Sequence, residues 1–190
     1  MSRGQTTLDF AIGVSVFLIV VAFVLAFVPG MLDPFVTGSE EEPVVANRVA
    51  DSLSQGRLGA PSDPYSLSVT CTTAFFAEGE TGTGGSLPSE CTRFENDVSH
   101  TERVGIEAHD GASYGLRIRI VADLNDDGTA QPLCKDGSTL TESPPVSCGG
   151  TSYSVGSSPP SDSNSVSVAR RLVYLPDTQG MDASLLVEVW

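Results

Sequence analysis

Residues 10–28 read FAIGVSVFLIVVAFVLAFV, a run in which 17 of the 19 residues are apolar and none is charged. At about 1.5 Å of rise per residue, a helix over this run is roughly 28 Å long, close to the hydrocarbon thickness of a bilayer. Pro29 and Gly30 follow directly, and they predict that the helix ends there. The run is longer than the apolar part of a secretory signal peptide, and no A-x-A site lies near its end. We therefore expect a transmembrane helix that stays on the protein.

The rest of the chain is acidic. Of 190 residues, 24 are Asp or Glu and 10 are Lys or Arg, which gives a net charge of −14. This balance argues against a nucleic-acid partner and against attachment to anionic lipids, because both need a basic surface. Lys135 is the single lysine. An acidic, lysine-poor composition suits molar salt, which shortens the Debye length to roughly 3 Å; an ordinary acidic extracellular domain is the alternative.

The charges on either side of the apolar run predict its orientation. Arg3 precedes the run, whereas Asp33 and Glu40–Glu42 follow it, and the next basic residue is Arg48. The positive-inside rule then places the N-terminus in the cytoplasm and the bulk of the chain outside the cell.

Asp9 directly precedes the apolar run, where a carboxylate at the membrane boundary costs free energy. One interpretation is structural: an acidic side chain can cap a helix by accepting hydrogen bonds from its first free amides. The other is that this carboxylate has a function.

The start of the chain supports the second interpretation. Arg3-Gly4 is followed by Gln5-Thr-Thr-Leu-Asp9-Phe10, which leads straight into the apolar run. This string resembles the prepilin signal of archaeal type IV pilins, and Gln5, Thr7, Asp9 and Phe10 resemble a subtype that reads Gln-x-Ser/Thr-x-acidic-aromatic. The chain lacks the Ser-Pro-x-Ile-Gly start of many haloarchaeal pilins. The resemblance covers about 26 residues.

The resemblance implies a processing step and a set of partners. A prepilin peptidase would cleave between Gly4 and Gln5 on the cytoplasmic side, leaving Asp9 as the fifth residue of the mature chain. The helix would then pass from the membrane into a bundle of identical or related subunits. There Asp9 would pair with the terminal amine of a neighbour, and this pairing would set the register of the subunits. Helices that pack in lipid rely on small residues, and the run offers Ala11, Gly13, Ser15, Ala22 and Ala26.

We expect an α+β fold, with the N-terminal helix followed by a short amphipathic helix and a small antiparallel β-rich domain. The expected divisions are a leader over 1–4, the apolar helix over 5–28, a hinge over 29–42 and the extracellular domain over 43–190. The amphipathic helix is predicted to begin at a capping box, Ser39-Glu-Glu-Glu42, or with Pro43 as its first residue, and to end at Gly56. Its stripe of apolar residues predicts packing on the domain core, with a contact between subunits as the alternative; the stripe consists of Val45, Ala46, Val49, Ala50 and Leu53.

The remaining pattern has the period of two that is typical of strands. Apolar and polar residues alternate in Tyr65–Thr72 and in Leu116–Ile120, and each stretch is predicted to be a strand. Val166–Leu175 and Ser184–Trp190 predict a closing hairpin joined by 176–181. Two stretches rich in Ser, Thr, Gly and Pro are predicted to be long loops, 78–90 and 141–165.

Four cysteines lie outside the predicted membrane span. An even number in an exported chain predicts disulfides. Of the three possible connectivities we favour Cys71–Cys91 and Cys134–Cys148, since each closes one loop. A zinc site is disfavoured because the chain has no Cys-x-x-Cys spacing.

A metal site elsewhere has one partial signal. Asp123, Asn125 and Asp127, followed by Gly128, match the first half of a calcium-binding loop. Cys134 stands where that loop needs a bidentate acid, and a simple Asp-Gly turn explains the same residues. We expect no cofactor, with calcium as the low-ranked exception.

No recognised catalytic motif occurs in the sequence, so we expect no enzyme activity. The sequence favours a structural subunit of a type IV pilus-like surface filament, anchored in the membrane. The alternative is a monomeric, single-span surface protein whose extracellular domain binds a ligand or partner.

Overall fold

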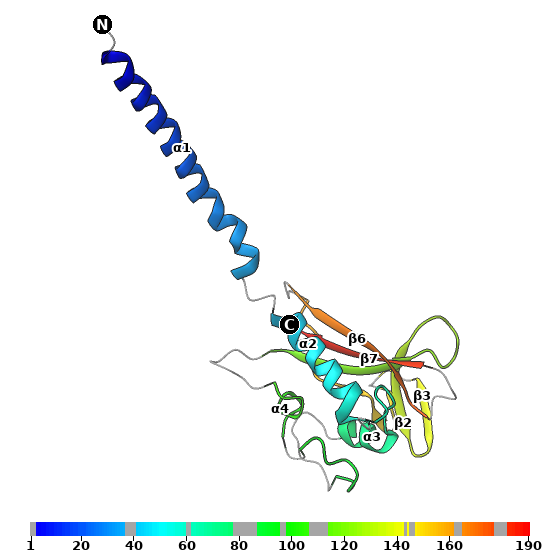
Figure 1. Cartoon of the computed structure of the whole chain (residues 1–190). Helices are drawn as coiled ribbons and strands as arrows, with labels where there is room; N and C mark the ends of the chain where they lie inside the picture. Colours follow the sequence, from blue (N-terminus) through cyan, green and yellow to red (C-terminus); the bar gives the residue numbers. More distant parts are fainter. Residues whose placement is uncertain are drawn as a thin grey trace. The chain divides into compact units, whose positions relative to one another are not determined.

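The computed structural model describes ten segments of the chain (Figure 1): 3–36, 41–59, 62–77, 87–95, 98–106, 114–142, 144, 147–161, 165–176 and 182–190. The chain divides into two compact units, Met1–Glu40 and Glu41–Trp190. The first unit is helical, and the second combines short helices with one antiparallel sheet. The expected α+β class is confirmed.

The first unit contains helix α1, Arg3–Val36. The helix continues through Pro29 and Gly30, so the predicted end at these residues is wrong, and 29–36 are helical rather than part of a hinge. Proline removes one amide donor and disturbs one turn. Helix α1 contains two prolines, Pro29 and Pro34, and each disturbs only its own turn, which long apolar helices commonly tolerate.

The second unit begins with helix α2, Glu41–Ser52, which runs on into a π-helical turn, η2, Leu53–Arg57. The predicted stripe faces the sheet, where Ala46, Val49, Ala50 and Leu53 are at most 2% exposed. Packing on the core is therefore confirmed for this helix.

The predicted ends of this helix differ from the observed ones. Glu41 is its first residue, so Pro43 is the third rather than the first, and Ser39 lies outside the described residues. Gly56 lies inside η2, and the turn is closed by Leu58, whose N–H donates to the carbonyl of Leu53. The wider π turn carries the chain past the glycine that was expected to stop it.

Five strands form the main path of the sheet, in the order β3-β2-β1-β7-β6, with all pairs antiparallel. The sheet buries one face under α2 (Figure 1). The strand predicted over Leu116–Ile120 and the closing hairpin are confirmed as β1 and as β6 with β7. The bounds are β1 Leu116–Ala122, β2 Gln131–Asp136, β3 Thr139–Glu142, β6 Ser167–Tyr174 and β7 Asp182–Val189.

The stretch 141–165 is more than the loop that its composition predicted. It contains two short strands, β4 Thr151–Ser152 and β5 Ser154–Val155, which pair with β2 and β1. Tyr153, between them, is fully buried and bridges the two main strands through its backbone: its N–H donates to Leu133 and its carbonyl accepts from Ile120. Tyr153 thus orders a segment whose composition is otherwise that of a polar loop.

The predicted strand over Tyr65–Thr72 is wrong, because helix α3 occupies Val69–Ala77. Ser68 precedes this helix, and its hydroxyl accepts a hydrogen bond from the amide of Cys71 at 3.3 Å, as in an N-cap. The buried side chains recur at helical spacing, Cys71 with Phe75 and Thr72 with Phe76. Four-residue α4, His100–Arg103, begins with a capping box from Ser99 to Glu102.

Candidate functional site

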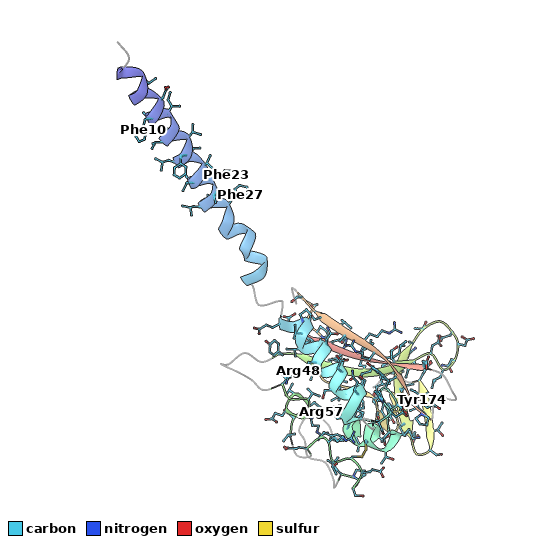
Figure 2. The ribbon with its side chains drawn as sticks, in the orientation of Figure 1. Phe10, Phe23, Phe27, Arg48, Arg57 and Tyr174 are labelled. Carbon is cyan, nitrogen blue, oxygen red and sulfur yellow. A yellow bond between two sulfur atoms is a disulfide. The ribbon has the colours of Figure 1, made fainter. Side chains whose placement is uncertain are left out.

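The apolar surface of α1 is the first candidate site. Leu8–Phe27, 20 residues with a mean hydropathy of 2.9, is long and apolar enough to cross a membrane, and no part of it is buried. Apart from Val21, whose exposure is intermediate, its large apolar side chains are 38–73% exposed, around the circumference of the helix (Figure 2). By length and composition alone, a signal sequence near the N-terminus would also qualify, but a surface of this kind needs lipid or another apolar partner in either case.

Two faces of the helix differ in the size of their side chains. At about 100° per residue, Ala11, Ser15, Ala22 and Ala26 fall within a sector of about 60°. Phe23 and Phe27 lie on another face and stack with their ring centroids 4.7 Å apart. The small-residue face is therefore where a second helix can approach most closely.

Ser15 is a polar residue inside the apolar span. Its hydroxyl donates to the carbonyl of Ala11 at 2.8 Å, so its hydrogen-bonding group is satisfied within the helix itself. The helix therefore presents no unsatisfied hydroxyl at this position to an apolar environment.

The residues of the predicted processing site lie at the beginning of α1. The structure places the backbone of Gly4 and Gln5 in its first turn and Asp9 in its second. Asp9 and Phe10 are both exposed, and Phe10 is 73% accessible. Since the helix begins at Arg3, Asp9 is not its N-cap, and the structural interpretation of this carboxylate fails.

The four cysteines form the two predicted disulfides. Cys71 is joined to Cys91 and Cys134 to Cys148, with Cα–Cα distances of 5.3 and 5.7 Å. Glu90 lies close enough to Cys71 and Cys91 for the three to resemble a metal cluster. Both sulfurs are committed to the disulfide, however, so neither is a thiolate ligand.

The predicted calcium residues share one loop, and their hydrogen bonds are those of a turn. The carboxylate of Asp123 accepts from the amides of Asp127 and Gly128, at 3.0 and 2.8 Å. Gly128 has a φ of +82°, as an Asp-Gly turn requires. Cys134 lies in its disulfide. These contacts are those of an Asp-Gly turn, and calcium binding stays a low-ranked prediction.

Sequence reasoning missed one acidic residue at this loop. Glu142, at the end of β3, accepts hydrogen bonds from the backbone amides of Leu124 and Asn125, and from Asn125 Nδ2 at 2.7 Å. It fastens the turn to β3. Only the pairing of β2 with β3 brings Glu142 to the loop, and spacing along the chain does not show that pairing.

A cluster of three charged residues lies on the sheet face away from α2. Glu188 of β7 is only 6% exposed and forms ion pairs with Arg117 and Arg119 of β1. Burial alone would raise the pKa of Glu188, but the hydrogen bonds and charges of the two arginines outweigh it, so the pKa lies below its ordinary value. The alternation of the sequence predicts that Arg117 and Arg119 lie on one face of β1, but it does not identify Glu188 as their partner.

Three further arginines donate hydrogen bonds to carbonyls at the ends of helices. Arg93 donates to the carbonyl of Gly56 in η2, Arg57 to that of Arg103 at the end of α4, and Arg103 to that of Phe75 in α3. Cations at helix C-termini bond the free carbonyls and offset the helix dipole. These arginines line a polar cavity of about 520 Å³.

Comparison with known proteins gives one match. A family model described as a family of unknown function (DUF7287) matches residues 1–190. No curated protein and no solved structure matches the chain.

Proposed function

We propose that this chain, which belongs to the family of unknown function DUF7287, is a structural subunit of a type IV pilus-like cell-surface filament. A prepilin peptidase cleaves it before Gln5, and the mature chain assembles through α1. The observation that carries the proposal is the uncovered apolar surface of Leu8–Phe27, which begins four residues after Gly4, the end of the proposed leader.

The exposed helix needs an apolar environment at every stage. Burying one large apolar side chain gains about 1.5–3 kcal/mol, so the many exposed side chains of α1 together represent tens of kcal/mol. A membrane supplies this burial to the single subunit. A bundle of identical helices supplies it in the filament, so the helix can pass from one to the other without meeting water.

The position of the cleavage site fits this transfer. The Gly4–Gln5 bond lies in the first turn of α1, where the amides have no partner within the helix and the turn opens easily. Cleavage there removes the leader and leaves the whole apolar span on the mature chain. A signal peptide cut after its apolar region would lose that span.

Asp9 supplies the specific contact between subunits. After cleavage it lies one helical turn from the new terminal amine of Gln5. In the filament it accepts the amine of a neighbouring subunit, while the face of Ala11, Ser15, Ala22 and Ala26 lets the helix backbones approach closely. An unpaired buried carboxylate would cost several kcal/mol, so the pair fixes the register of the subunits.

The second unit is then displayed outside the cell. Its two disulfides are typical of an oxidising, extracytoplasmic compartment. The single-pass topology, with the N-terminus in the cytoplasm, follows from the charges that flank the span.

Replacing Asp9 tests the assembly step separately from processing. In cells that express the chain, Asp9→Ala should leave cleavage intact and reduce the subunit in sheared surface filaments more than tenfold, whereas Asp9→Glu should retain part of it. Ala22→Phe should also prevent assembly, and Val20→Phe, on another face of the helix, is its matched control. Normal filaments from Asp9→Ala cells would refute the proposed role.

A monomeric, single-span surface protein is the second candidate. The observation that favours it is the unpaired outer edge of β6, described below, which can bind a partner without any filament. An uncleaved N-terminus together with a monomeric chain in the membrane would support this second function.

A further inference from the structure

Strand β6 is the last strand of the sheet, and one side of it has no partner along most of its length. At its end, the N–H of Tyr174 donates to the carbonyl of Tyr65 and the carbonyl of Tyr174 accepts from Leu67, so both backbone groups of Tyr174 point away from β7. In an antiparallel ladder, every second residue points the same way. Val168 and Leu172 of β6 therefore direct their amides outward.

No backbone partner meets these outward groups among the described residues. Arg170 also points its amide outward, and its carbonyl accepts only the side chain of the adjacent Arg171, at 3.0 Å. Natural edge strands are usually protected by a bulge, a proline, a short length or charged side chains, and of these protections β6 has only its two arginines. β6 pairs with β7 over eight residues in unbroken register and contains no proline.

The side chains of the same residues form an apolar strip. Val168, Leu172 and Tyr174 are 56%, 61% and 44% exposed on the sheet face away from α2. At the end of the strand, Leu172 and Tyr174 line a hollow of about 400 Å³ together with Tyr65. Figure 2 labels Tyr174 at this position.

One positive charge lies in the middle of the strip. Arg170 donates to the hydroxyl of Ser184 at 2.9 and 3.0 Å, and no carboxylate of the described residues pairs with it. β6 itself contains two arginines and no acidic residue, in a chain whose net charge is −14. An incoming strand therefore meets apolar, positive and apolar side chains in turn.

We propose that the free edge of β6 binds an extended segment of a partner protein, which adds a strand to the sheet and alternates apolar, acidic and apolar side chains opposite Val168, Arg170 and Leu172. Backbone hydrogen bonds supply the affinity and the alternating side chains supply the selectivity. A second copy paired symmetrically about Arg170 would place two arginines opposite each other, which is unfavourable. The proposal does not depend on assembly through α1.

A designed peptide tests this site on the full chain in a non-ionic detergent. The probe is fluorescein-labelled Thr-Val-Thr-Glu-Thr-Val-Thr, which presents the same pattern in either strand direction, and binding is followed by fluorescence anisotropy. The same peptide with Lys in place of Glu should bind about fivefold more weakly, because opposite and like charges across a strand pair differ by about 1 kcal/mol.

Two variants of the chain separate strand addition from a general apolar contact. Val168→Pro removes an outward amide that the sheet does not use, and it should weaken binding more than tenfold, whereas Val168→Ile should bind like the wild type. Arg170→Glu should reverse the preference, so that the Lys peptide binds more tightly than the Glu peptide.

Three results would overturn the proposal: no anisotropy change up to about 1 mM peptide, equal binding by Val168→Pro in a chain that still unfolds cooperatively, or an unchanged preference in Arg170→Glu. Self-association of the wild-type chain that Val168→Pro abolishes, measured by analytical ultracentrifugation, would assign the edge to a second copy instead.

Discussion

Glu188 shows how a single buried charge connects two strands of the sheet. Its partners Arg117 and Arg119 lie on β1, so its two ion pairs cross the junction between β1 and β7. Removing one member of a buried group of charges leaves the others uncompensated, which costs more than the intact pairs contribute.

We expect Glu188→Gln to lower the free energy of unfolding by about 2 kcal/mol at pH 7. The pKa of Glu188 is lowered in the folded state, so its contribution is fully present above the unfolded pKa of about 4.3 and is lost as the pH falls through the folded value. Thermal unfolding of both chains from pH 7 to pH 3 should show a steeper acid loss for the wild type. Parallel pH profiles would contradict this role.

A substitution at Thr72 should raise the free energy of unfolding, whereas the substitution at Glu188 should lower it. Its hydroxyl is fully buried in α3 and has no hydrogen-bond partner among the described residues. Thr72→Val removes this unsatisfied group at nearly constant volume, and it should raise the free energy of unfolding by about 1 kcal/mol. Denaturant unfolding measures the change.

The neighbouring Thr73 is the matched control for that substitution. Its hydroxyl lies 2.8 Å from the hydroxyl of Tyr153 in a hydrogen bond. Thr73→Val should therefore destabilise the protein by about 1 kcal/mol. Equal effects of the two substitutions would show that hydrogen bonding does not distinguish these positions.

At the level of single residues, pairs that lie close together along the chain could be predicted from the sequence. Pairs that form only because two strands are neighbours in the sheet could not. Cys134 and Cys148 were paired correctly because they bracket one loop. Glu188 and Glu142 escaped notice because their partners lie on other strands, and one sequence does not show how its strands are ordered.

At the level of elements, the most informative error concerns α3. Polar and apolar residues alternate from Tyr65 to Thr72, but Tyr65 has a φ of +69°, which a strand does not allow, and Ser68 starts a helix. This stretch of sequence fits both the two-residue period of a strand and the period of a helix, and the burial of Phe75 and Phe76 favours the helix. Strand β1 was predictable from its alternation, and β6 and β7 were predictable from their β-rich composition.

The disulfide Cys71–Cys91 is an element-scale constraint, since it ties α3 to the segment after residue 86. Cysteines separated by 20 positions close a loop for which the chain-entropy model gives about 3 kcal/mol. Replacing both residues by Ala should lower the free energy of unfolding by about that amount. Denaturant curves for the double variant and for the reduced wild type, measured together, test this expectation, and an unchanged midpoint would refute it.

At the scale of the whole molecule, acidity and hydropathy are divided between the two units. Arg3 and Asp9 cancel, so the net charge of −14 lies beyond residue 30, and all of it except the charges of Asp33 and Glu40 lies in the second unit. The apolar unit requires lipid or other copies of itself. The acidic unit remains hydrated, but its like charges repel one another, which destabilises the compact state.

This self-repulsion predicts a salt dependence. Raising sodium chloride from about 0.1 to 2 M shortens the Debye length from roughly 10 Å to less than 3 Å, and it should raise the Tm of the full chain in non-ionic detergent by about 5 °C. Most of the rise should occur below about 0.5 M, because screening saturates. A Tm that is constant or falls over this range would contradict the account.

The most direct test of the proposed function is mass spectrometry of the N-terminus of the chain purified from its native membrane. Processing before assembly predicts a chain that starts at Gln5 with a free terminal amine, with Gly4 and everything before it removed. A chain that starts at cyclised Gln5 would support the cleavage but contradict the proposed pairing of its amine with Asp9. A chain that still begins at Met1 or Ser2 would contradict the proposal that this protein is a processed filament subunit.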